Sequence, residues 1–250
     1  MENKNIKNKL LTVLLVIASS LFILSFAIII PCFIRGFYIN QIDQIGALEE
    51  TNFITETYYG TTITKQDIID AFNAVMDFIW KGKPFPVDPV NEDSVLTGIL
   101  PLSTSAAAHF KDCIFLFWLD MIVFIVTVLI LITLLVLYIL KKWKPVKIFR
   151  MSPLFLAGLI VLTLLVAILI LGVSVGFEKL FELFHVVMFP GKQNWLFDYR
   201  YDVIINCLTE DFFFNCAVFI GSFAIGLSLI AICYSIILRI IEHKKKKAAN

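Results

Sequence analysis

Two histidines in the sequence have carboxylates beside them at helical spacing. Asp112 follows His109 by three residues, and Glu182 precedes His185 by three. Side chains three or four positions apart are neighbours on one helix face. Two imidazoles with orienting carboxylates can share the general-base and general-acid steps of acyl transfer near neutral pH. They could instead bind a metal such as zinc, for which two histidines and two carboxylates are a weak signal.

Asp120 is a further candidate because of its position along the same predicted helix as His109. At about 100° per residue, eleven residues return Asp120 almost to the azimuth of His109. An ionisable residue inside a membrane span usually faces the interior of the bundle and has a function. The alternative is a polar contact between helices. The third histidine, His243, lies among terminal lysines and is expected to be solvated.

The motifs of several common enzyme classes are absent from the sequence. It has no HExxH, no glycine-rich phosphate loop and no CxxC pattern. This argues against the usual metalloprotease and nucleotide-binding functions. Aromatic residues near basic ones indicate a membrane interface rather than nucleic-acid binding. We therefore expect no cofactor, no resident metal, no nucleotide and no nucleic-acid partner.

The elements that position these residues are predicted to be membrane helices. The chain is 59% hydrophobic and 16% charged, with a mean hydropathy of +0.88, well beyond a soluble domain. Four apolar stretches are long enough to cross a bilayer, which needs about 20 helical residues. They lie at about 10–34, 113–140, 153–176 and 214–238. We predict an all-α polytopic membrane protein, a four-transmembrane-helix bundle forming a single membrane domain over residues 1–250.

The distribution of charge predicts the orientation. Short loops rich in lysine and arginine stay in the cytoplasm. The N-terminal tail, the loop at about 141–152 and the C-terminal end together hold 13 of the 21 basic residues. We therefore expect both termini to be cytoplasmic. Two extracytoplasmic lobes follow, at about 35–112 and 177–213, and they carry 17 of the 20 acidic residues.

The first lobe contains one clear helix signal. Thr64 with Asp67 three residues later is close to a capping box. Apolar residues then recur at steps of three and four: Ile68, Ile69, Phe72, Val75, Met76, Ile79 and Trp80. This face could pack against the lobe or lie on the bilayer. A turn region starting at Lys81 and an irregular apolar segment precede His109, which we expect about one turn outside the lipid.

The second lobe is predicted to start as an outward, amphipathic extension of the third membrane helix, without a break. Its apolar side has Phe177, Leu180, Phe181, Phe184 and Met188, and its polar side has Glu178 and Glu182. Pro190 and Gly191 end it. His185 lies on this extension, so both histidines are expected on the outer side of the membrane.

The sequence resembles the bacterial lipoprotein intramolecular transacylase family over nearly its whole length. The similarity lies in His109-Phe-Lys-Asp112 ahead of the second span and in Phe-Glu-Leu-Phe184-His185. It continues through Phe189, Trp195-Leu-Phe197, Asp202 and Glu210-Asp-Phe-Phe213. The four spans and the long first and short second lobes fit the family too.

The resemblance implies a reaction at the outer face of the bacterial cytoplasmic membrane, among membrane phospholipids. A diacylglyceryl-modified lipoprotein would pass its sn-2 acyl chain to its own α-amino group. His109 and His185 would be catalytic, with supporting or orienting roles for the carboxylates and the tryptophan: Asp112, Glu182, Asp120, Asp202, Trp195 and Glu210. A covalent acyl-histidine intermediate is also compatible. The alternatives are an accessory protein or receptor, another lipid-directed acyltransferase or hydrolase, and a transporter.

Overall fold

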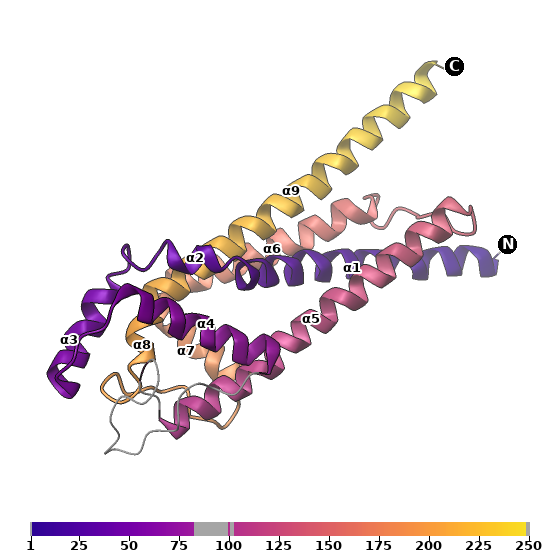
Figure 1. Cartoon of the computed structure of the whole chain (residues 1–250). Coiled ribbons are helices and arrows are strands. Elements are labelled where there is room, and N and C mark those ends of the chain that lie inside the picture. Colours follow the sequence, from indigo (N-terminus) through magenta and orange to yellow (C-terminus); the bar gives the residue numbers. More distant parts are fainter. Residues whose placement is uncertain (1, 83–99, 101–102, 249–250) are drawn as a thin grey trace. The chain divides into compact units, whose positions relative to one another are not determined.

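The computed structural model describes residues 2–82, 100 and 103–248 (Figure 1). Within these ranges the chain forms helices and no β-strand, which confirms the all-α prediction. The helices are α1 Glu2–Phe33, α2 Arg35–Ile39, α3 Ala47–Tyr59, α4 Lys65–Lys81, α5 Thr104–Ile139, α6 Pro153–Val175, α7 Phe177–Met188, α8 Ile204–Cys207 and α9 Glu210–Ala248. Most of the predicted turn region after Lys81 and of the irregular segment that follows it lies outside the described residues.

Four of these helices are long and apolar enough to cross a membrane, as predicted. They are α1, α5, α6 and α9, with apolar windows of mean hydropathy 2.9, 3.2, 3.2 and 2.4. Three of them are longer than their predicted spans. Helix α1 already starts at Glu2. Helix α5 already starts at Thr104, and α9 continues to Ala248. Helix-forming alanines and lysines flank the apolar stretches, so the helical backbone does not stop where the apolar sequence does.

The chain divides into two compact units, and all four long helices contribute to both. The membrane unit comprises the described residues of Met1–Ile30, Asp120–Leu171 and Phe219–Asn250. The lobe unit comprises those of Pro31–Leu119 and Gly172–Val218. The assignment of the whole chain to one membrane domain stays a prediction.

Small residues let the helices of the membrane unit approach one another closely. Ala27, Ala157 and Ala224 are fully buried. A β-carbon at Gly158 would lie 2.7 Å from the carbonyl oxygen of Ser228, so a larger residue there would force α6 and α9 apart. Contacts of this kind replace the hydrophobic effect, which does not drive helix association in lipid.

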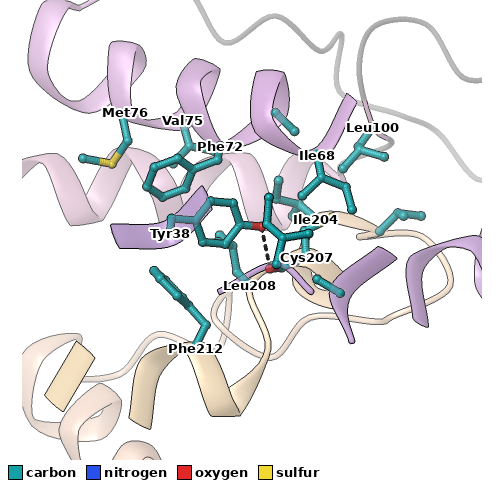
Figure 2. Packing of buried hydrophobic residues seen from close by; sticks show 14 of the residues in the cluster. Tyr38, Ile68, Phe72, Val75, Met76, Leu100, Ile204, Cys207, Leu208 and Phe212 are labelled. Atoms are coloured by element: carbon teal, nitrogen blue, oxygen red, sulfur yellow. Dashed lines mark hydrogen bonds between the residues drawn. The ribbon is translucent and has the colours of Figure 1, made fainter. Parts of the chain in front are cut away.

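The lobe unit has a hydrophobic core of its own, centred on Tyr38 of α2. Figure 2 shows its ring against Phe72, at a centroid distance of 4.1 Å, and near the ring of Phe212, at 5.0 Å. Its hydroxyl donates to the carbonyl oxygen of Cys207 at 2.7 Å. Burial raises the pKa of Tyr38 well above its ordinary value, so the hydroxyl stays a donor. This bond fastens α2 to the short helix α8.

Helix α4 supplies one wall of this core. Thr64 and Asp67 form the predicted capping box at its start. Its buried residues are Ile68, Ala71, Phe72, Val75, Met76 and Ile79. The sequence allowed this apolar face either to pack against the lobe or to lie on the bilayer. In the structure it packs into the core of the lobe unit.

The extension of the third membrane helix contains a break, contrary to the prediction. Helix α6 ends at Val175, and Gly176 has a φ of +88°, which residues with a β-carbon rarely adopt. Helix α7 then starts at Phe177 and ends at Met188, ahead of Pro190 and Gly191. Gly176 thus makes α7 a separate helix whose direction is not fixed by α6.

Candidate active site

The start of α5, which carries His109, is capped by residues from two parts of the chain. The Ser103 hydroxyl oxygen accepts from the backbone N–H of Ala106 at 3.1 Å. The backbone N–H of Ser103 donates to Oδ1 of Asp202 at 2.7 Å, across 99 residues. The other carboxylate oxygen of Asp202 accepts from the backbone N–H of Asp198 at 3.1 Å. In a capping box the helix supplies that carboxylate itself; here a distant loop supplies it and fixes the helix that bears His109.

His185 is held in one tautomer by the backbone of its own helix. Its Nδ1 lies 2.8 Å from the carbonyl oxygen of Phe181. A carbonyl can only accept, so Nδ1 carries the hydrogen and Nε2 of the neutral ring carries a lone pair. Burial lowers the pKa of His185 below its ordinary value of 6.5, outweighing the bond to Phe181, which raises it. The ring is therefore neutral at pH 7, with a basic nitrogen at Nε2.

The two histidine rings lie side by side within a group of aromatic rings. Their centroids are 5.5 Å apart, and His109 and His185 are only 6% and 7% exposed. Phe189 makes an edge contact with His109 at 4.8 Å, and Phe197 lies 5.6 Å from it. Trp195 stacks on His185 at 4.9 Å. These rings exclude water from a pair of groups that can both exchange protons.

The nitrogens of His109 have few partners. Nε2 lies 3.5 Å from the sulfur of Cys113. Nδ1 is buried and has no hydrogen-bond partner in the described part of the chain. Buried polar atoms are almost always hydrogen-bonded, and exceptions concentrate at functional sites. This nitrogen is suited to contact a substrate.

Asp112 and Glu182 were expected to orient the two histidines, but neither is hydrogen-bonded to a histidine in the described part of the chain. Asp112 accepts from Nζ of Lys192 at 2.5 Å and from Nδ2 of Asn194 at 2.9 Å, both in the loop after α7. Glu182 is exposed. The carbonyl of Phe181, four residues before His185 and thus directly below its ring, holds Nδ1 in place of Glu182. Asp112 instead ties α5 to the loop that carries Trp195.

The remaining predicted residues lie at four different places. Trp195 belongs to the site, and its indole N–H donates to the carbonyl of Lys192 at 3.1 Å. Asp202 supports the start of α5. Glu210 is the exposed first residue of α9. Asp120 belongs to the membrane unit, where Ser25 hydrogen-bonds its carboxylate; this is the helix-to-helix contact that was its alternative role.

A metal site has no geometric support in the region that the structure describes. No group of three or more histidine, cysteine, aspartate or glutamate residues there is arranged to hold an ion.

Several site groups could not be found from the sequence. They are the carbonyl of Phe181 and the side chains of Lys192 and Asn194. Lys192 and Asn194 come just before an aromatic-rich segment, where the sequence indicates only an interfacial position. Their partner, Asp112, lies about 80 residues earlier on another helix, and no local pattern connects them. The aromatic partners Phe189 and Phe197 did have a signal, since both are part of the motif similarity.

The chain is similar to known membrane proteins. A family model described as lipoprotein intramolecular transacylase Lit matches residues 13–213. The membrane-integral lipoprotein intramolecular transacylase Lit from Bacillus cereus has a similar structure. Its TM-score is 0.71 at 22% identity, covering 95% of this chain and 97% of that one. Two variants of that protein, with a histidine replaced by arginine or by alanine, match with a TM-score of 0.69 at 22% identity, covering 98% of this chain and 97% and 98% of theirs. No curated protein sequence matches significantly.

Proposed function

Because the chain belongs to the lipoprotein intramolecular transacylase family, we propose that it acts on diacylglyceryl-modified lipoproteins. It transfers the sn-2 acyl chain of the modified N-terminal cysteine to the α-amino group of the same cysteine. The product is an N-acyl S-monoacylglyceryl lipoprotein, the lyso form. The observation that carries the proposal is the pair of buried imidazoles, 5.5 Å apart, inside an aromatic enclosure.

The chemistry needs only groups that this pair can supply. The α-amino nitrogen attacks the ester carbonyl carbon; the N–C bond forms and the bond from that carbon to the glycerol oxygen breaks. The amine loses one proton and the glycerol oxygen gains one, so no proton is consumed overall. Amide formation from an ester is downhill, and no nucleotide or other cofactor is required.

The fixed tautomer of His185 supports assigning one of these proton transfers to each histidine. Its Nε2 lone pair takes the proton from the attacking amine, because its Nδ1 hydrogen is bound to Phe181. His109 gives a proton to the departing glycerol oxygen and regains one from His185, since the two rings are neighbours. Positioned acid–base groups of this kind contribute rate factors of about 10²–10⁴.

The surface of α7 supports a lipid substrate. Its exposed apolar residues are Leu183, Phe184, Val186, Val187 and Met188, between 45% and 65% exposed, on the helix that buries His185. Acyl chains of the substrate and of membrane phospholipid would cover them. The distribution of basic residues supports placing this site on the extracytoplasmic side of the bacterial cytoplasmic membrane.

Mass spectrometry of the N-terminal peptide of a model lipoprotein tests the proposal. Expression of the protein should convert the diacyl form to the lyso form, and His109→Ala and His185→Ala should each lower conversion by about 10²–10⁴. His243→Ala is the matched control, since this exposed histidine lies in the C-terminal tail.

Each other result has a definite meaning. An unchanged diacyl form with the wild-type protein contradicts the transacylase function and favours an accessory or receptor role. Release of free fatty acid with an unmodified α-amine indicates a hydrolase. Full conversion by both alanine variants shows that the histidines are not catalytic.

A further inference from the structure

Asn194 lies between the two elements that bear the histidines. The next residue, Trp195, stacks on His185 with centroids 4.9 Å apart. The side chain of Asn194 is bonded to Asp112, which is one turn along α5 from His109. The amide group of Asn194 is thereby placed at the site, although neither histidine uses it.

The partner of Asn194 fixes which way its amide faces. The Asp112 carboxylate can only accept, so the NH₂ group of Asn194 must point toward it, at 2.9 Å. The amide oxygen, Oδ1, consequently faces away from Asp112. Lys192 binds the same carboxylate at 2.5 Å, so the charges of Asp112 and Lys192 offset each other beside this oxygen.

Two polar atoms at this place lack partners. Oδ1 of Asn194 is buried without a hydrogen bond to any described residue, and so is Nδ1 of the 6%-exposed His109. Leaving a buried acceptor unsatisfied is unfavourable, and such groups are retained where a ligand satisfies them. The missing partner of Asn194 is a donor, because an amide oxygen can only accept.

We propose that Oδ1 of Asn194 binds one N–H of the substrate's α-amino group. This rests on the proposed transacylase function and assigns the group that recognises its nucleophile. A neutral amine has two N–H groups and a lone pair. Asn194 holds the first N–H, the proton of the second passes to a histidine, and the lone pair forms the bond to the ester carbonyl carbon. The offset charges of Asp112 and Lys192 leave the acceptor without net charge, which suits the neutral, attacking form of the amine.

Binding of two unreactive lipopeptides to the purified full-length protein in lipid nanodiscs tests this assignment. Both have an ether in place of the sn-2 ester, so no acyl chain can move. One has the natural N-terminal cysteine, and the other has 3-mercaptopropionyl in its place, which lacks only the amine. We expect the wild type to bind the amine-bearing peptide about tenfold more tightly, the size of one well-made buried hydrogen bond. Asn194→Ala should reduce this ratio to about one.

Two further variants separate recognition from folding. Asn52→Ala is the control: Asn52 also braces a loop of the lobe unit, but both of its amide atoms are bonded to Ile63, and its loss should leave the ratio unchanged. Asp112→Asn keeps the shape of the side chain but no longer fixes the amide of Asn194, so the ratio should fall toward one. This variant decides the matter if Asn194→Ala does not fold.

The outcomes distinguish this assignment from the proposed function. If the ratio stays near tenfold in Asn194→Ala and Asp112→Asn, or is already near one in the wild type, Asn194 does not bind the amine. Conversion of the ester substrate by the wild type would still stand in that case. If the wild type prefers the amine-bearing peptide but leaves ester substrates unchanged, the amine site is supported and the transacylase function is wrong.

Discussion

Helices α4 and α7 are both amphipathic and both belong to the lobe unit, yet they bury opposite kinds of residue. Helix α4 buries six residues of its apolar face: Ile68, Ala71, Phe72, Val75, Met76 and Ile79. Helix α7 buries only His185 and leaves Leu183, Phe184, Val187 and Met188 exposed. The first pattern is that of a structural helix. In a membrane protein, the second is that of a helix whose apolar side contacts lipid.

The position of His185 around α7 explains why one histidine is buried there. At about 100° per residue, Glu178 and Glu182 lie on one side of it, and Phe181 and Met188 on the other. His185 thus stands at the border between the polar and the apolar arc of the helix. An ester bond of a membrane lipid has the same environment, with acyl chains on one side and a polar headgroup on the other. We therefore propose that the amphipathic pattern of α7 serves substrate contact, whereas that of α4 serves folding.

The largest expected difference between the two helices is in stability. Phe72→Ala should lower the free energy of unfolding by about 3–5 kcal/mol, because it leaves a cavity in the lobe core beside Tyr38. Phe184→Ala removes a ring that is 46% exposed and should cost less than about 1 kcal/mol. Denaturant unfolding in detergent, followed by circular dichroism, measures both. Equal losses would show that α7 is as much a structural helix as α4.

The next effect concerns the caps of α4 and α5, two of the helices that start in the lobe unit. Asp202→Ala removes the acceptor of two backbone N–H groups, those of Ser103 and Asp198, and should cost about 2–3 kcal/mol. Asp67→Ala removes the exposed, local cap of α4 and should cost about 1 kcal/mol or less. Hydrogen exchange should show faster exchange at the start of α5 in the first variant. Unchanged exchange there would mean that Asp202 does not hold the helix that carries His109.

These two caps also show what the sequence can reveal. Thr64 and Asp67 are three residues apart, so their capping box is a local pattern and was predictable. Ser103 and Asp202 are 99 residues apart, and their bond exists only after the lobe has folded. The same holds for Asp112 with its partners in the loop after α7. The four membrane helices were predictable because hydropathy is a local property that needs no tertiary contact.

The candidate site was predictable to the extent that its chemistry is local. His109 and His185 could be chosen by residue type and topology, but their carboxylate neighbours suggested orienting bonds that are not formed. In α7 the carbonyl of Phe181 satisfies Nδ1 of His185, and Glu182 remains exposed. Spacing along a helix shows which side chains are near each other. It does not show that a backbone carbonyl is the nearer acceptor.

A smaller difference between α7 and α4 lies in the pH range over which a residue of each helix titrates. Burial lowers the pKa of His185 from 6.5, so NMR titration of its ring should give a midpoint below 6.5. Trp195→Ala exposes the ring and should raise the midpoint toward 6.5. The His185→Ala spectrum assigns the signal. A midpoint at or above 6.5 in the wild type would contradict the buried, neutral base.

The linked changes in stability fall in two separate ranges of pH. Below pH 6.5 the unfolded chain binds a proton at His185 before the folded protein does, so stability falls as the pH drops. Hydrogen bonds from Thr64 lower the pKa of Asp67 below 3.8, so the contribution of that cap is lost only as the pH falls below 3.8. Thermal unfolding of Asp67→Ala and the wild type should therefore differ by the same amount at pH 5 and pH 7. A difference that changes between these two values would mean that the cap of α4 titrates outside its expected range.

The smallest effect tests the apolar face of α7 itself, with two adjacent valines. Val187 is 65% exposed on the apolar side, and Val186 is 53% exposed on the side of Lys179 and Glu182. Serine at either position should change the stability in detergent by no more than about 0.5 kcal/mol. In lipid vesicles, Val187→Ser removes apolar area that contacts acyl chains, worth about 1 kcal/mol, so KM for a diacylglyceryl lipopeptide should rise about fivefold with kcat unchanged. Val186→Ser should leave KM unchanged. If both variants raise KM equally, the two sides of α7 are equivalent toward lipid, and its amphipathic pattern must have another cause.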